Sequence, residues 1–171
     1  ESAIFVMNAD GTGVRRLSQG KGFKFTPKWS PDGRRIAFVS LPASALGHNS
    51  DIWVMNSDGT GETRLTTDPA GDGCPSWSPD SKRVVFSSSR SGDSEIYVMD
   101  ADGRNQRRIT NDPADDATPA WSPDGKRIAF ASDRSGRSHI YTMNPDGTGV
   151  ARLSEGSRGE TYPEWSPDGR M

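Results

Sequence analysis

The sequence predicts an all-β protein, a β-propeller of four-stranded antiparallel blades, with about four blades in the chain as a partial or half ring. A Trp-Ser-Pro-Asp phrase occurs four times, and an Ile-x-x-Met phrase alternates with it at the same intervals of 48, 44 and 44 residues. Periods in the forties fit four-stranded blades or paired helices. No ten-residue stretch shows a 3.6-residue apolar period free of Gly or Pro, so the sequence favours strands.

The first predicted strand of each blade ends at a tryptophan, and the second follows a Ser-Pro-Asp-Gly turn. The four tryptophans are Trp29, Trp77, Trp121 and Trp165. In the turn, Pro presets the first central residue, Asp tolerates the second, and Gly accepts the left-handed conformation that follows. Ser81 replaces this Gly in one copy, so we expect that turn to be strained. The second strand is short, apolar and rich in branched or aromatic residues, as in 36–39.

The third strand contains the Ile-x-x-Met phrase, and an Asn-x-Asp-Gly type of turn joins it to a fourth strand with an Arg-Leu or Arg-Ile end. The spacings between strands are constant, except that the loop between the second and third strands is longer in the first copy, at 41–49. Constant spacing predicts that one backbone shape is reused in every blade.

These spacings predict one propeller array over residues 1–171, with complete blades at about 27–67, 75–111 and 119–155. A split blade would combine residues 162–171 with residues 3–18, and its second strand is absent. An open arc exposes sheet edges and apolar faces. We therefore expect self-association into a homodimer that completes a ring of about eight blades.

The composition excludes several classes of function. The net charge is -2, from 21 basic and 23 acidic residues, so no basic field is available to bind nucleic acid. No apolar run approaches the roughly 20 residues that span a bilayer, so we expect no membrane insertion. The single cysteine, Cys74, excludes an intrachain disulfide and a multi-cysteine zinc site. No signal peptide opens the sequence, so we expect any targeting segment to have been removed or to lie outside it.

Three motifs carry a resemblance to a known family. They are Trp-Ser-Pro-Asp-Gly-Lys/Arg-Arg-Ile-Ala-Phe, the Ser-Asp-Arg-Ser-Gly segment at 132–136, and Ile-Tyr-Val-Met-Asp-Ala-Asp-Gly at 96–103. The chain resembles the TolB-like propeller repeat, which also occurs in the propeller domains of the prolyl oligopeptidase family. This resemblance implies a non-catalytic scaffold that binds a protein or peptide, located in the bacterial periplasm or outside the cell. One fold hosts many activities, so the resemblance is more specific for fold than for function.

The repeated tryptophans are expected to pack between blades, and functional residues are sought where the copies differ. The loops that join a fourth strand to the next first strand differ most, and they should open toward the central channel. They supply an acidic sector and one basic, aromatic corner, and the long loop supplies a histidine. The candidate partner-binding residues are Lys21, Phe23, Lys24, Phe25, His48, Asp68, Asp72, Asp112, Asp115, Asp116 and Glu160. The alternative is a solvated loop face without a ligand.

A docking surface for a cationic peptide is the reading that these charges favour. No cofactor or metal ligand set is predicted, although a cation bound at the channel mouth stays open as an alternative. Catalysis is not expected, because only His48 and His139 are present and no Gly-x-Ser-x-Gly elbow occurs. Two other functions remain. One is a substrate-gating propeller domain of a larger serine peptidase or other hydrolase. The other is a metal-dependent lyase, which would need more histidines.

Overall fold

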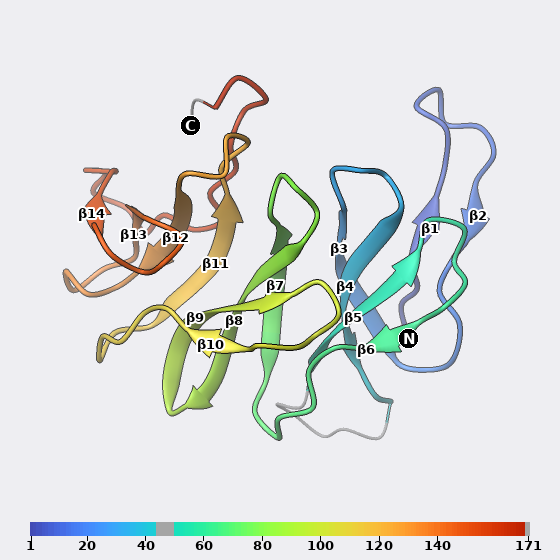
Figure 1. The fold of residues 1–171 in the computed structure, drawn as a ribbon, viewed down its shortest axis with the longest axis horizontal. Helices are drawn as coiled ribbons and strands as arrows, with labels where there is room; N and C mark the ends of the chain where they lie inside the picture. Colours follow the sequence, from blue (N-terminus) through green and yellow to red (C-terminus); the bar gives the residue numbers. More distant parts are fainter. Residues whose placement is uncertain (44–49, 170–171) are drawn as a thin grey trace.

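The computed structural model describes residues 1–43 and 50–169, and every regular element in them is a β-strand (Figure 1). The strands are β1 (Phe5–Val6), β2 (Arg15–Arg16), β3 (Phe23–Trp29), β4 (Arg35–Leu41), β5 (Asp51–Asn56), β6 (Thr63–Arg64), β7 (Asp72–Trp77), β8 (Arg83–Ser91), β9 (Asp93–Asp100), β10 (Arg107–Arg108), β11 (Asp116–Trp121), β12 (Ile128–Ser132), β13 (His139–Met143) and β14 (Ala151–Arg152). No helix suited to crossing a bilayer is found in this part of the chain.

The strands form three four-stranded antiparallel sheets and one two-stranded sheet. Strands β3–β6, β7–β10 and β11–β14 make the larger sheets, each in sequence order, and β1 pairs with β2. The sheets stand side by side in an arc, with β1 and β2 at one end and the C-terminal segment at the other (Figure 1). The prediction of an all-β partial propeller of about four blades is confirmed.

The same backbone geometry recurs in every complete blade, because the pairing register is identical. The second and third strands place Ile36 opposite Met55, Val84 opposite Met99, and Ile128 opposite Met143. The expected turns follow the first strands. In the turn where a serine replaces glycine, Ser81 has a φ of 59°, which is the strained conformation that the sequence predicts.

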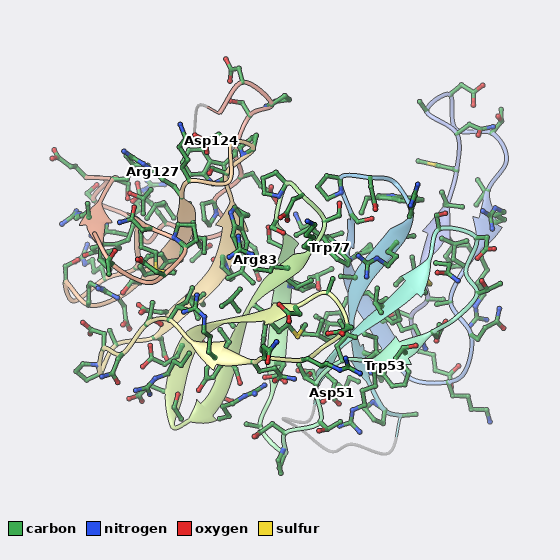
Figure 2. The ribbon with its side chains drawn as sticks, viewed as in Figure 1. Asp51, Trp53, Trp77, Arg83, Asp124 and Arg127 are labelled. Atoms are coloured by element: carbon green, nitrogen blue, oxygen red, sulfur yellow. The ribbon has the colours of Figure 1, made fainter. Side chains whose placement is uncertain are left out.

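The core lies between adjacent blades rather than within one sheet. The aromatic residues at the centres of the second strands, Phe38, Phe86 and Phe130, are fully buried. Trp77, labelled in Figure 2, is also buried and packs in a cluster between successive sheets. Trp121 occupies the same place in the next cluster. Each blade therefore rests on the one before it, as expected of a radial array.

An arginine from the preceding blade covers each of these tryptophans. The Arg35 guanidinium lies 4.8 Å from the centre of the Trp77 ring, and that of Arg83 lies 4.7 Å from the centre of Trp121. Such stacking adds a cation–π attraction to the burial of the ring. Trp165 packs against Ala129, Ala131 and Ile140, and its indole N–H donates to the Ala120 carbonyl at 3.0 Å.

The two ends of the arc differ from the expected blade interior. Trp29 was expected to pack between blades, but half of its surface is exposed, because among residues 1–43 and 50–169 no second strand pairs with β1 to cover it. Residues 162–167 were expected to form a first strand, but they have no regular strand assignment, and within the described residues no second strand pairs with them. These residues and β1 lie at opposite ends of the arc (Figure 1).

Candidate functional site

The first strand of every blade carries a bulge at the same place, three residues before the tryptophan. In β3, β7 and β11 the pairing register shifts at this position. Thr26, Cys74, Thr118 and Tyr162 have φ values of 48°, 51°, 50° and 56°, and each of them precedes a proline. Non-glycine residues in this conformation store backbone strain. A bulge also breaks the regular alternation of side chains along the strand, so the side chain of the bulged residue points in a different direction.

A cavity of about 60 Å³ lies where these bulged segments come together. Its lining comes from all three first strands and from the C-terminal segment, and comprises Thr26, Lys28, Cys74, Pro75, Ser76, Thr118, Pro119, Ala120, Tyr162, Pro163 and Glu164. An ion pair between Lys28 and Glu164 links β3 to the C-terminal segment. We call this surface the channel wall. Its cavity has room for a side chain rather than a large cofactor.

The channel wall offers few reactive groups. Burial raises the pKa of the Cys74 thiol, which opposes formation of a nucleophilic thiolate. The hydroxyl of Thr26 is buried and has no hydrogen-bond partner within the described part of the chain. That hydroxyl could donate to, or accept from, a polar atom of a ligand that enters the cavity.

The loops beside this wall join the fourth strand of one blade to the first strand of the next, and we call them the loop face (residues 18–22, 66–71, 110–115 and 154–161). The residue five positions before each tryptophan lies at or next to the junction of the loop with the following segment, and these residues are Lys24, Asp72, Asp116 and Glu160. They are four of the candidate residues from the sequence. The structure gives them different surroundings.

Asp72 and Asp116 are fully buried and each is held by an arginine. Arg90 donates to both oxygens of Asp72 at 3.0 Å, and Arg134 donates to those of Asp116 at 2.9 and 2.8 Å. Each guanidinium also lies over aromatic rings, as Arg134 does over Tyr141 at 5.0 Å. In each pair one guanidinium nitrogen binds both carboxylate oxygens, and this buried charge pairing means that Asp72 and Asp116 fix the loops rather than attract a cationic partner.

A second acidic position lies just before the Ile-x-x-Met phrase, facing the next blade. Asp51 contacts Arg64 at 2.7 Å, and Glu95 accepts a hydrogen bond from Thr110 at 2.6 Å. Burial raises the pKa of both carboxyls, and the nearby Asp72 and Asp116 add to the shift. Asp51 lies on the loop side of the arc, opposite the turn that contains Asp124 (Figure 2).

The third blade has a histidine at this position, and the surrounding residues include a serine and a glutamate. Glu160 accepts a hydrogen bond from Ser154, which lowers the pKa of the carboxyl, and it lies 3.3 Å from Nδ1 of His139. The carboxylate therefore separates the hydroxyl from the imidazole. A catalytic triad needs the imidazole between the serine and the acid, so this arrangement does not activate Ser154.

Among the other candidate residues, some side chains are exposed and others are held by hydrogen bonds. Lys21, Phe23 and Phe25 are exposed, whereas Lys24 is buried and its Nζ donates to the Gln19 carbonyl at 2.6 Å. Asp68 accepts from the amide of Ala70. His48 lies outside the described residues.

Asp112 and Asp115 are the accessible part of the acidic loop. Asp112 lies 3.8 Å from Arg134 and keeps a third of its side chain exposed, and Asp115 is exposed while accepting from the amide of Ser94 at 2.8 Å. The structure therefore leaves a smaller acidic surface than the sequence suggests. Among the described residues, no three His, Cys, Asp or Glu side chains gather as a metal site would require.

A repeated serine that organises the loop face was not singled out from the sequence. Its four copies stand two positions before the Ile of each Ile-x-x-Met phrase, and they are Ser2, Ser50, Ser94 and Ser138. Their hydroxyls donate to the carbonyls of Lys24, Asp72, Asp116 and Glu160 at 2.9, 3.0, 3.0 and 2.7 Å. The sequence could have indicated these serines, because they recur at intervals of 48, 44 and 44 residues, the same spacing as the repeated phrases.

Repeated antiparallel sheets, packed face to face with their bulged first strands lining one shared cavity, define a β-propeller repeat protein. The chain belongs to the TolB beta propeller domain family, whose model matches residues 1–171.

Solved structures agree with this assignment. The chain is similar to TolB from Acinetobacter baumannii, with 30% identity and a TM-score of 0.85, and the match covers 98% of this chain and 41% of that one. A putative TolB from Agrobacterium tumefaciens matches with 24% identity and a TM-score of 0.69, covering 98% of this chain and 74% of that one. The chain thus spans less than half the length of the Acinetobacter protein.

An enzyme shares the same fold. A puromycin hydrolase matches with 16% identity and a TM-score of 0.75, covering 92% of this chain and 26% of that one. At this identity the likeness concerns the fold alone. No curated protein matches the chain.

Proposed function

We propose that this chain is a non-catalytic scaffold that binds a protein or peptide at the loop face and the adjoining channel wall. One observation carries the proposal. The positions that build the blades are alike in every copy, whereas the exposed positions on and beside the loop face differ, with Phe23 and Phe25 at the start of β3 and Asp112 and Asp115 in the loop before β11. A rigid frame with variable connecting loops is the usual arrangement of a binding surface.

The chemistry of the partner follows from the accessible charges. Asp112 and Asp115 are the accessible acids of the loop before β11, so we propose a partner segment that carries lysine or arginine. The family suggests a bacterial periplasmic or extracellular setting, which we include in the proposal. The position of the Glu160 carboxylate between Ser154 and His139 supports the choice of binding over serine catalysis at this place.

Titration with a lysine–alanine octapeptide tests the acidic sector. The Asp112→Asn/Asp115→Asn variant should bind at least about threefold more weakly, and the difference should shrink at high salt because exposed charges are screened. Asparagine retains an acceptor for the amides of Ala114 and Ser94. Asp116 is left intact because it is buried against Arg134.

The matched control is Asp10→Asn/Asp102→Asn, which removes the same charge from two exposed turns between third and fourth strands. This control should bind like the parent protein. Equal affinity of the parent and the Asp112/Asp115 variant would remove the acidic sector from the proposal.

A substrate-gating role in a larger hydrolase is the second candidate, favoured by the fold shared with puromycin hydrolase. It requires a catalytic domain in the same gene, so the gene sequence around this segment separates the two functions.

We also propose that two chains associate head to tail into a ring of about eight blades. Light scattering should then give a mass near twice 18.5 kDa. A folded monomer across micromolar concentrations would reject the ring and leave the loop-face proposal in place.

A further inference from the structure

In the second and third complete blades, an arginine near the end of the second strand fills the space beside the buried loop acid. Arg90 donates from Nε to the Ser88 hydroxyl at 2.8 Å and from Nη1 to Gln106 at 2.7 Å, in addition to its contacts with Asp72. Its guanidinium lies 4.7 Å from the centre of the Tyr97 ring. The third complete blade repeats the serine, acid and tyrosine contacts of this guanidinium. Each of these two blades therefore has one carboxylate–guanidinium pair against an aromatic ring.

The first complete blade has a cavity at this place, because it lacks both the acid and the arginine. Counted along the repeat, the positions of Asp72, Arg90, Ser88 and Tyr97 are occupied by Lys24, Pro42, Ser40 and Trp53, in that order. A cavity of about 290 Å³ lies among these four side chains, next to the loop at 18–22. Figure 2 shows Trp53 on the loop side of the arc.

Lys24 places a buried positive charge in this cavity without a countercharge. It is 7% exposed, and its Nζ donates to the carbonyl of Gln19. Within the described part of the chain no carboxylate forms an ion pair with Lys24, whereas Asp72 has Arg90. The sequence at 43–49 contains neither Asp nor Glu, so the long loop of this blade brings no carboxylate. Because a buried ion is costly unless it is paired, the cavity favours an anionic ligand.

The rest of the lining suits a small, flat acid. Trp53 presents an aromatic ring, and the Ser40 hydroxyl can donate to an anion. Lys21 adds a second ammonium group, and Glu62 adds one carboxylate, which accepts a hydrogen bond from the amide of Gln19. Two ammonium groups against one carboxylate leave the lining with a net positive charge. The volume lies near the lower end of the roughly 300–1,000 Å³ of ligand pockets, so it fits a small molecule.

We propose that this cavity binds a small organic acid that carries a carboxylate on a flat ring. The carboxylate pairs with the ammonium group of Lys24 and accepts a hydrogen bond from Ser40, and the ring packs on Trp53. The ligand thus supplies the opposite charge that Arg90 supplies to the loop acid of the next blade, with the signs reversed. The site lies apart from the acidic loop before β11 and does not rest on the proposed function.

Benzoate, benzamide and benzamidine test the charge preference, because they have similar shapes and are anionic, neutral and cationic at neutral pH. Each is titrated into the nitrogen-15-labelled protein and followed by NMR. Benzoate should give saturable shifts of the Trp53 indole N–H and of the amides at 19–24. Benzamide and benzamidine should bind at least about tenfold more weakly, because neither forms the charge-assisted bond with Lys24.

Variants of the lining test the two contacts separately. Lys24→Met removes the charge from a side chain of similar length and should weaken benzoate binding by at least about tenfold. The matched control is Lys82→Met, at an exposed position in the turn between β7 and β8, and it should leave the affinity unchanged. Trp53→Tyr introduces the ring of the other blades and should retain binding. Trp53→Leu should weaken it by about two- to tenfold, the range expected for an aromatic contact.

Three results would overturn the proposal. One is tighter binding of benzamidine than of benzoate, which would make Glu62 and Trp53 a cation site. Another is equal benzoate affinity of the parent protein and Lys24→Met. The third is the absence of shifts at tens of millimolar benzoate. If Lys24→Met does not fold, the comparison of the three probes on the parent protein decides. The Asp112/Asp115 variant leaves this cavity intact, so failure here is distinct from failure of the peptide test.

Discussion

At the scale of single residues, the same residue type serves different purposes according to its partners. Asp72 and Asp116 look like exposed loop acids in the sequence, but each is enclosed by an arginine that also lies over two aromatic rings. Asp115, next to Asp116 in the sequence, is exposed. The sequence does not distinguish Asp115 from Asp116, because burial depends on the direction in which each side chain points from the backbone. The loop acids could be predicted as a group, and their division into structural and accessible residues could not.

Loss of the Arg134 guanidinium should leave the carboxylate of Asp116 buried and uncompensated. We expect Arg134→Met to lower the free energy of unfolding by about 3–5 kcal/mol in urea denaturation, the cost of breaking one side of a buried ion pair. The double variant Arg134→Met/Asp116→Leu should recover most of that loss. Arg104→Met, at an exposed ion pair, is the control and should change little. Equal effects of Arg134→Met and Arg104→Met would contradict a structural role for the buried pair.

The raised pKa of Asp51 predicts a pH-dependent effect of Asp51→Asn. Burial favours the protonated acid in the folded state, so the carboxylate opposes folding once the pH rises above the usual value of 3.8 and through the folded pKa. Asn stays neutral. The stability of Asp51→Asn relative to the parent should therefore rise with pH across this range and level off above it. Contact with Arg64 reduces the size of the effect.

The control for this experiment has the opposite sign. The amide of Lys126 and the hydroxyl of Ser122 lower the pKa of Asp124, so its carboxylate favours folding above 3.8 and this contribution is lost as the pH falls. Asp124→Asn should therefore lose stability relative to the parent as the pH rises. Urea midpoints measured from pH 3 to 7 would show the two slopes. If the stabilities of Asp51→Asn and Asp124→Asn relative to the parent changed with pH in the same direction, the opposite pKa shifts of Asp51 and Asp124 would be contradicted.

At the scale of elements, strands and turns were predictable because their signals repeat. The Ser-Pro-Asp turn and the Ile-x-x-Met strand each occur in every copy. One copy alone would predict a strand or turn only weakly, but four copies at fixed spacing predict the repeated blade strongly. The bulge at Thr26, Cys74, Thr118 and Tyr162 could not be inferred in the same way, because its residue type varies and only the following proline recurs. The register shift itself, seen in β3, β7 and β11, depends on pairing with the neighbouring strand, which is a tertiary property. Tyr162 has the same positive φ without a paired strand.

The turns between third and fourth strands also touch the previous blade, which predicts unequal effects of the same substitution. A Cβ at Gly147 would lie 2.2 Å from the Ile109 carbonyl oxygen, whereas one at Gly11 would meet nothing within 4 Å. Both glycines have positive φ, at 94° and 84°.

Gly147→Ala should thus lower the free energy of unfolding by about 1–3 kcal/mol more than Gly11→Ala, because only Gly147 adds a steric clash to the backbone strain. Thermal and urea denaturation of the two variants would measure the difference. Gly103→Ala, at a turn that contacts the Leu65 carbonyl, should resemble Gly147→Ala. Equal losses for Gly11→Ala and Gly147→Ala would show that the contact between blades adds nothing.

At the scale of the whole molecule, the number of blades was predictable, but the surroundings of the arc ends were not. Trp29 has the same sequence context as Trp77, yet one is half exposed and the other buried. The difference comes from the neighbouring blade, which local sequence does not describe. Repeat counting therefore predicts the interior of an array better than its ends.

Nearest-neighbour packing predicts a gradient of stability along the arc. Amides in β4, β8 and β12, which lie between other strands, should exchange only through global unfolding. Amides in β1 and β2, and in residues 162–169, should exchange through local opening at a much smaller free energy. Native-state hydrogen exchange at increasing urea measures this difference. A uniform opening energy along the chain would mean that the arc unfolds as one unit.

The arginine that each blade extends over the tryptophan of the next gives the molecule a polarity. The packing between blades is therefore directional, because a complete blade contributes its tryptophan to one interface and its arginine to the next. A blade set into this array in the reverse orientation would lose the stacking contact on both sides.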